Sequence, residues 1–190
     1  MLKELVAKSR SYRRFDEAVK ISRQTLVGLV DLARLSPSGA NMQPLKFYVS
    51  ADAEKNESIF PTLGWAGYLK EWAGPEAGER PTGYILVLKD KGIAHVAGID
   101  HGIAAQSIML GAVEKGLGGC FIGNIDRPRL FQVTGLSPDD YEILLVLALG
   151  KPIEQVVVDD INENGDVKYW RDASGVHHVP KRTLQELVVG

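Results

Sequence analysis

The stretch from Ser36 to Pro44 has the residue types of a ligand-binding loop: two prolines, a glycine and two amide side chains, with almost nothing to bury. The prolines fix φ near both ends, and the small residues allow another molecule to approach the backbone closely. Asn41 and Gln43 can each donate and accept hydrogen bonds, which suits the edge of a flat heterocycle. An ordinary loop between a helix and a strand is the alternative interpretation.

A second polar stretch lies upstream and reads Ser9-Arg10-Ser11-Tyr12-Arg13-Arg14-Phe15. Its arginines supply forked cationic donors and its serines supply hydroxyls, which are the groups that replace water around a phosphate monoester. Taken alone, this stretch is more typical of a basic turn in solvent. Together with the loop at 36–44, it indicates a site for a planar ligand that carries a phosphate.

Aromatic residues and glycines alternate between positions 61 and 81, where Trp65, Tyr68 and Trp72 stand among several glycines and prolines. These three aromatic residues are candidates for a lid over a planar ligand, and therefore for a substrate pocket. A subunit interface and the packed face of a helix are the alternatives, but the glycines weaken a regular helix.

The totals exclude several classes of protein. The 190 residues, 45% of them hydrophobic, fit a single domain over 1–190. A net charge of −2 with both signs interspersed gives no field for nucleic acid or an anionic membrane. The lone Cys120 excludes an internal disulfide, and neither a signal peptide nor a membrane span is visible. We therefore expect a soluble, cytoplasmic protein.

Helices and strands are expected to alternate around these polar stretches. Ser22 is a plausible N-cap for a helix that runs to Leu35 and leads into the loop at 36–44. The longest helix is expected at 96–115, with Ile99, Ile103, Gln106, Leu110 and Val113 on one face. Its small residues permit close helix packing, in the core by default or at a dimer interface: Gly102, Ala104, Ala105, Gly111 and Ala112. The other expected elements are helices at 2–8, 51–59 and between Asp126 and Gly135, and strands at 46–49, 84–88, 118–123 and 143–149. This order indicates an α/β or α+β sheet covered by helices.

The tail beyond Pro152 changes character: a valine run at 156–158 is followed by an acidic turn and then by a segment that ends in a small helix. It has no self-contained hydrophobic pattern, yet it carries Trp170, so we expect it to pack on something, most simply a partner subunit. His177 and His178 are adjacent, point to different sides and lack a supporting carboxylate at a ligand spacing, so no metal site is predicted.

Four motifs in order resemble the nitroreductase family of FMN oxidoreductases. The basic stretch resembles the family's Arg-Arg-Ser-x-Arg-x-Phe motif apart from Ser9, and Pro37 to Pro44 resembles its Pro-Ser-x-x-Asn-x-Gln-Pro-Trp loop, with Leu45 in place of Trp. The glycine-framed stretch that leads to Ile122-Gly123 and the closing Pro180-Lys181-Arg182 also agree in order and spacing. The resemblance covers nearly the whole chain.

The resemblance implies an α+β fold with a central mixed sheet of four to five strands, and a homodimer with FMN at its interface. The C-terminal arm, residues 151–190, would pack on the partner. The implied FMN-binding residues are Arg10, Ser11, Tyr12, Arg13, Pro37, Ser38, Asn41, Gln43, Ile122, Gly123, Lys181 and Arg182. Either Lys181 or Arg182 would contact the phosphate, the residues at 37–43 would serve the partner's FMN, and the Gly123 amide would lie near flavin N5.

The implied activity is transfer of a hydride from NAD(P)H through FMN to an electron-poor acceptor such as a nitroaromatic or a quinone, with ping-pong kinetics. No side chain is then needed as nucleophile or general base, which agrees with a chain that lacks Ser-His-Asp and Cys-His arrangements. A flavin carrier or sensor without enzymatic activity, and a dehalogenase or dehydrogenase on the same fold, remain alternatives. The preference for NADH or NADPH is open, since no G-x-G-x-x-G unit is present.

Overall fold

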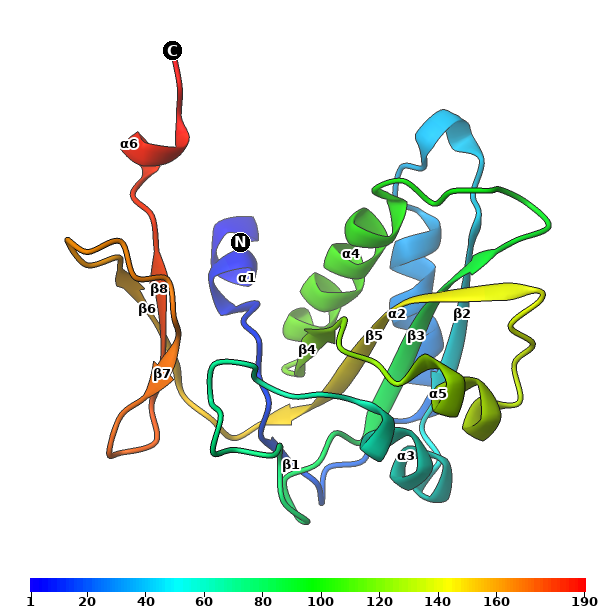
Figure 1. The fold of residues 1–190 in the computed structure, drawn as a ribbon, viewed down its shortest axis with the longest axis horizontal. Coiled ribbons are helices and arrows are strands. Elements are labelled where there is room, and N and C mark those ends of the chain that lie inside the picture. Colours follow the sequence, from blue (N-terminus) through cyan, green and yellow to red (C-terminus); the bar gives the residue numbers. More distant parts are fainter.

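The computed structural model describes residues 1–190 and contains one five-stranded sheet with helices on both faces (Figure 1). The long strand β5 lies at its centre: β3 and then β2 follow on one side, and β1 and β4 pair with different parts of β5 on the other. The strands are β1 (Phe15–Asp16), β2 (Leu45–Ser50), β3 (Gly83–Asp90), β4 (Gly118–Ile122) and β5 (Tyr141–Pro152).

Every ladder of this sheet is antiparallel. The α+β class predicted from the sequence is therefore confirmed, but within the chain the sheet is not mixed as we expected. The long strand β5 provides the reason, because its twelve residues give β1, β3 and β4 one common antiparallel partner. The one parallel pairing at this sheet is an isolated bridge between Ser11 and Gly119.

The helices of the body lie close to where the sequence placed them. Ser22 caps α2 by accepting from the Thr25 amide, and Asp126 caps α5 by accepting from the Arg129 amide. Gly135 ends α5 in the left-handed region at φ 72°, where a residue without Cβ is favoured. The helices and 3₁₀ turns are α1 (Leu2–Lys8), α2 (Arg23–Arg34), η1 (Gly39–Asn41), α3 (Ala53–Ile59), η2 (Phe60–Thr62), α4 (Asp100–Glu114) and α5 (Arg127–Thr134).

The start of α4 is corrected: the helix begins at Asp100 instead of 96, and Ile99 lies just before it and is 76% exposed. The expected packing of the small residues in the core is confirmed for Ala104, Ala105, Gly111 and Ala112, which are buried, whereas Gly102 is exposed. Ile108 and Met109 are buried beside them. The small residues let α4 approach the sheet and α2 closely.

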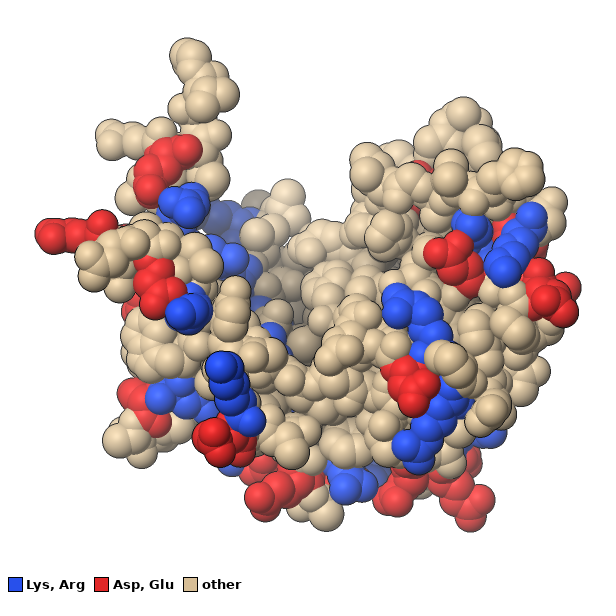
Figure 2. Space-filling view, viewed as in Figure 1, with Lys and Arg blue, Asp and Glu red and all other residues tan.

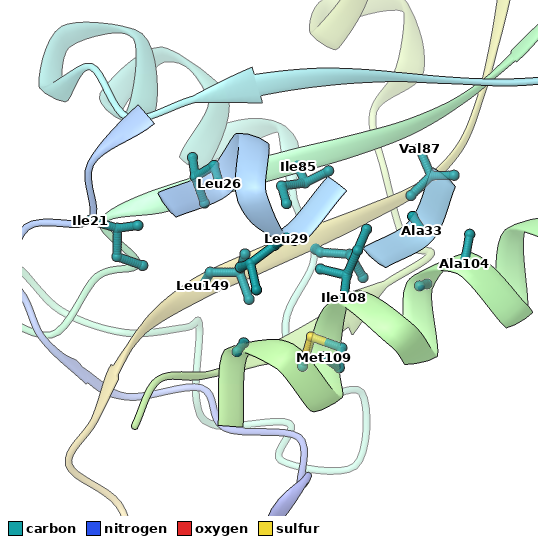
Figure 3. Packing of buried hydrophobic residues seen from close by; sticks show 13 residues of the cluster. Ile21, Leu26, Leu29, Ala33, Ile85, Val87, Ala104, Ile108, Met109 and Leu149 are labelled. Carbon is teal, nitrogen blue, oxygen red and sulfur yellow. The ribbon is translucent and has the colours of Figure 1, made fainter. Parts of the chain in front are cut away.

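Helices α2 and α4 together form one hydrophobic core against the sheet (Figure 3). Leu26 and Leu29 of α2 and Ile108 of α4 extend toward the strands, where Ile85 and Leu149 meet them. A second core on the other face of the sheet lies under α3 and α5 and includes Tyr84, Leu86, Leu130 and Ile143. Buried apolar surface on both faces explains why β3 and β5 are apolar in a continuous run.

Two helix glycines are expected to respond oppositely to alanine. A Cβ at exposed Gly28 of α2 would meet nothing within 4 Å, so Gly28→Ala should raise the free energy of unfolding by about 0.5–1 kcal/mol through helix propensity. At Gly111 of α4 the same Cβ would overlap Leu32 and lie 3.1 Å from Leu29, so this variant should be less stable than the Gly28 variant by about 1–3 kcal/mol. Chemical denaturation of both variants tests the pair, and equal stability would contradict the α2–α4 packing.

The C-terminal arm forms a small sheet of its own, which the sequence did not predict. Its strands are β6 (Val156–Asp160), β7 (Trp170–Arg171) and β8 (His177–Lys181), and α6 (Leu184–Leu187) follows them. Strand β8 is central, parallel to β6 and antiparallel to β7. In Figure 1 the arm stands beside α1 and apart from the main sheet, and the chain end projects beyond it.

Candidate functional site

The basic stretch at 9–15 is fixed against strand β4. Ser11 forms a bridge with Gly119, and the Tyr12 amide donates to the Gly119 carbonyl oxygen at 3.0 Å. A Cβ at Gly118 would lie 2.6 Å from the Tyr12 ring, so glycine at this position permits the close approach. The glycine-framed strand thereby positions the basic residues.

A cavity of about 220 Å³ joins this stretch to the arm. Ser9, Ser11 and Val179 line it with the cations Arg10, Arg13 and Lys181, and no carboxylate is among the lining residues. The remaining wall consists of Tyr169 and His177. Figure 2 shows Lys and Arg side chains gathered on the arm side of the hollow between the arm and the body. Three cations without a lining carboxylate favour an anionic ligand.

Lys181 and Arg182, between which the sequence could not decide, differ clearly in the structure. Lys181 lines the cavity, whereas the Arg182 guanidinium pairs with Glu186 in the following helix at 3.5 Å. The geometry therefore favours Lys181 as the arm's contribution to this cavity.

Arg13 is the most enclosed cation of the site, with 9% of its surface exposed. Its Nη1 donates to the Ser11 carbonyl oxygen and to His177 Nε2, each at 3.3 Å, and its guanidinium lies 4.9 Å from the centre of the Tyr169 ring. Its backbone amide donates to the buried carboxylate of Glu154. Arg13 thus serves as a structural link between the N-terminal stretch and the arm as well as a cavity wall.

His177 is held as a neutral ring with a fixed tautomer. Arginine can only donate, so His177 Nε2 is the acceptor from Arg13 and Nδ1 carries the hydrogen. That Nδ1 atom is buried without a hydrogen-bond partner in the chain. Burial, with the charges of Arg13 and Arg171 adding to it, lowers the pKa of His177 to about 4.

This pKa predicts an acid-sensitive stability. Between its usual value of 6.5 and about 4, His177 takes up a proton in the unfolded chain but not in the fold, so the free energy of unfolding should decrease as the pH falls through this window. Denaturant titrations at several pH values between about 5 and 6.5, above the range of the carboxylates, should show this slope in the wild type. His177→Gln should flatten it; an unchanged slope in the variant would contradict the assignment.

His178 points to the other side of β8, as its adjacent position predicts. Its Nδ1 lies 2.8 Å from Asp159 and its Nε2 lies 3.4 Å from Asp172, while its ring stacks on Trp170. The hydrogen bond with Asp159, and then that with Asp172, raise the pKa of His178. These contacts join all three strands of the arm.

The loop at 36–44 is held by a residue that the sequence reading missed. The buried carboxylate of Asp100, in the first turn of α4, accepts from Ser38 Oγ at 2.6 Å and from the Gly39 amide at 2.9 Å. Ser38 Oγ in turn accepts from the backbone amide of Gln43 at 2.9 Å. The hydroxyl of Ser38 is therefore used to shape the loop. A helix start placed at 96 had put Asp100 inside the helix instead of in its first turn, where it meets the loop.

The same loop carries backbone strain. Ala40, Asn41 and Gln43 have φ values of 49°, 54° and 52°, a left-handed conformation that costs residues with a side chain free energy. Asn41 and Gln43 are both exposed, with their amide groups at the surface. Strain of this kind persists only where the surrounding contacts impose it, and it is frequent at binding sites.

The two polar stretches do not meet within one chain. Pro37, Ser38 and Gln43 line a second cavity, of about 350 Å³, which includes Asp100 and Ala104 and shares no lining residue with the first. One chain therefore presents these residues in two separate cavities.

Ile122 and Gly123 mark the end of β4. Ile122 is buried in the second core, so its side chain is a packing residue. Gly123 is exposed, and a Cβ there would meet nothing within 4 Å. The chain's own packing therefore does not require a glycine at 123, in contrast to Gly118.

The three aromatic residues proposed for the substrate pocket divide into two groups. Trp65 packs on Phe60 at 5.7 Å between ring centres and against Gly74, whereas Tyr68 and Trp72 contact the arm. The Tyr68 ring lies 4.9 Å from that of Tyr169, and Arg171 lies 4.2 Å above Trp72. The arm thus contacts its own chain through these residues. Tyr169, Arg171 and Glu154 had no signal in the sequence, because each is an isolated residue in an irregular tail.

Comparison with known proteins decides the family. The sequence matches the nitroreductase family over residues 6–151. The chain belongs to the nitroreductase family. A relative from Bacillus subtilis, YdgI, provisionally named an NAD(P)H nitroreductase, is 25% identical over 80% of this chain and 88% of its own.

Solved members of the family share the fold. A provisionally named nitroreductase from Desulfovibrio desulfuricans, solved in complex with FMN, has a TM-score of 0.70 at 22% identity and covers 100% of this chain and 95% of its own. A nitroreductase family protein from Clostridium novyi NT has a TM-score of 0.65 at 25% identity, over 80% of this chain and 86% of its own. The arm is thus matched in the first structure, while the family match ends at 151. None of the helices is long and apolar enough to cross a membrane.

Proposed function

We propose that this member of the nitroreductase family is an FMN-dependent oxidoreductase that transfers a hydride from NADH or NADPH to an electron-poor small molecule, such as a nitroaromatic or a quinone. The observation that carries the proposal is the cavity lined by Arg10, Arg13 and Lys181, with no carboxylate among its lining residues. A phosphate monoester is the anion that such forked and point cations bind best. The FMN named in the D. desulfuricans complex and the NAD(P)H in the name of YdgI support the same assignment.

The donors present fit FMN. Arg10 Nε is buried without a partner, so a donor is left over beside the cavity. Arg10, Ser11, Arg13 and Lys181 would hold the phosphate and the ribityl chain, and the open space at Gly123 leaves room for a flat ring beside its backbone. FMN, when bound, supplies the two-electron chemistry that no side chain of this protein offers.

The protein's own residues would bind and orient. These cations would also place positive charge near N1 and O2 of the flavin ring. Positive charge there favours the negatively charged reduced form and thereby raises the reduction potential. Reductant and acceptor would occupy the same face in turn, which gives ping-pong kinetics. Tyr68 and Trp72 contact the arm and would border the acceptor. Trp65, earlier in the same stretch of chain, packs on Phe60 and would support them from there. Because only these three aromatic residues would enclose the acceptor, we propose an open site that accepts a broad range of molecules.

We further propose that the active unit is a homodimer with FMN at the interface. The two partial sites of one chain share no residue, so a second copy is needed to bring Pro37, Ser38, Asn41 and Gln43 to the cavity at Arg13. Ile99 just before α4, 76% exposed, and the end of the arm, where Leu184 is 76% and Val189 93% exposed, would provide apolar surface for such contacts. Since Glu154, Tyr169 and Arg171 contact their own chain, the exchange of the arm would concern its last residues.

Cofactor binding tests the proposal directly. The purified protein is expected to be yellow, or to take up FMN in equilibrium dialysis, and to bind riboflavin, which lacks the phosphate, much more weakly. A colourless protein that binds neither compound would overturn the assignment. FMN binding without reduction by NADH or NADPH would instead favour a flavin carrier or sensor. A cytoplasmic location would give the enzyme access to both nicotinamide cofactors.

A further inference from the structure

Tyr169 stands between the cation-lined cavity and the aromatic segment 66–73. On the cavity side its ring lies 4.9 Å from the Arg13 guanidinium and 5.2 Å from the His177 ring. On the other side it lies 4.9 Å from the Tyr68 ring, and its Oη accepts from the Tyr68 amide at 3.3 Å. One side chain therefore forms both a wall of the cavity and the surface on which the segment rests.

A second connection runs in parallel. Trp72 lies under the Arg171 guanidinium at 4.2 Å, and Arg171 Nη2 donates to Glu154 Oε2 at 3.1 Å. The other oxygen of this buried carboxylate accepts from the Arg13 amide. Both connections from the segment thus lead back to Arg13, the enclosed cation of the cavity.

Beyond Ala66 at its start, which is buried, the segment has little else to hold it. It contains turns but no helix or strand, Tyr68 is 52% exposed, and the backbone adopts positive φ at Ala66 and Gly74. Trp65, at its base, is held separately on Phe60. Segments with few buried contacts open at low free-energy cost, so the contacts with Tyr169 and Arg171 decide whether this one is closed.

We propose that a phosphate group in the cavity closes the segment 66–73 through Tyr169, which acts as a positioning residue between the cofactor site and the substrate border. Without an anion, Arg10, Arg13 and Lys181 repel one another across the cavity. An anion removes this repulsion and so further stabilises the enclosed position of Arg13, and with it the Tyr169 ring that contacts Tyr68. The inference rests on the proposed function only in taking a phosphate monoester as the anion.

Hydrogen exchange of the segment, followed by mass spectrometry, is the test. FMN and inorganic phosphate should each slow exchange at 66–73 in the wild type by about tenfold, within the usual range of coupling between sites, while riboflavin and matched chloride should not. Inorganic phosphate is the decisive probe, because it is too small to touch the segment from the cavity. Exchange in β3 serves as the internal control for global opening.

Variants separate the coupling from the binding. Tyr169→Leu should exchange fast at 66–73 with or without phosphate, whereas Tyr169→Phe, which keeps the ring, should retain most of the protection. Because coupling is reciprocal, Trp72→Leu, outside the cavity, should weaken phosphate binding by the factor that it removes from the protection. If the wild type binds phosphate and FMN but exchange at 66–73 is unchanged, or if Tyr169→Leu is still protected, the coupling is overturned while the FMN function stands. If neither anion binds, both proposals fall.

Discussion

Lys181→Met is expected to weaken FMN binding by about 10- to 100-fold, the change that follows from losing one charged hydrogen bond of about 1.5–3 kcal/mol. Lys181 is exposed except where it lines the cavity with Arg10 and Arg13, so its removal should leave the free energy of unfolding nearly unchanged. Methionine keeps most of the unbranched side chain and removes the ammonium group with its charge and its donors. Fluorescence titration with FMN measures the effect.

Arg182→Met is the matched control. The adjacent Arg182 is also exposed but pairs with Glu186 and does not line the cavity, so its loss should change FMN affinity by no more than about twofold. A loss of affinity in the Arg182 variant that equals or exceeds the loss in the Lys181 variant would show that the arm presents the other cation to the phosphate.

Gly119→Ala is expected to cost about 3 kcal/mol or more in stability. A Cβ at this position would overlap the carbonyl oxygen of Ala148 and lie 2.7 Å from Leu149 Cδ2, both within the central strand pair. A backbone oxygen cannot rotate away, so β4 would have to separate from β5, and the Ser11 bridge would move with it. Thermal and denaturant unfolding should both report the loss.

Gly123→Ala, four positions further along the same stretch, should behave differently. A Cβ there meets nothing within 4 Å of the chain, so the stability should stay within about 0.5 kcal/mol of the wild type. FMN binding or its reduction by NAD(P)H should nevertheless suffer, because the methyl group would occupy the space proposed for the flavin. Full FMN affinity and reduction in this variant would place the ring elsewhere.

Local signals predicted most of the body. The cap at Ser22, the cap at Asp126 and the left-handed Gly135 each express chemistry within a few residues, and the structure places all three as expected. The strands were predictable for the same reason, since short apolar runs bounded by turn residues are typical of buried strands.

Features that depend on distant contacts were not predictable. Close packing of α4 against α2 leaves larger side chains of this helix, such as Ile103 and Leu110, only partly buried, which the sequence could not show. Asp100 became important only because the loop at 38–43 folds back onto it. The arm's own sheet depends on pairing across irregular connections and on His178 between Asp159 and Asp172.

The candidate site was predicted in part. Residue types identified the basic stretch, the amide loop and the closing cations, and the structure places Arg10, Ser11, Arg13 and Lys181 around one cavity. The sequence could not reveal that Tyr169 and His177 complete its wall, because their approach depends on how the arm docks against Arg13. It also could not reveal that Trp65 lies apart from Tyr68 and Trp72.

The most direct measurement of the central claim is the visible absorbance spectrum of the FMN-loaded protein before and after anaerobic addition of NADH or NADPH. We predict that the band of oxidised flavin bleaches with at least one of the two and returns when a nitroaromatic or a quinone is added. A band that persists with both reductants would contradict the oxidoreductase function proposed for this chain.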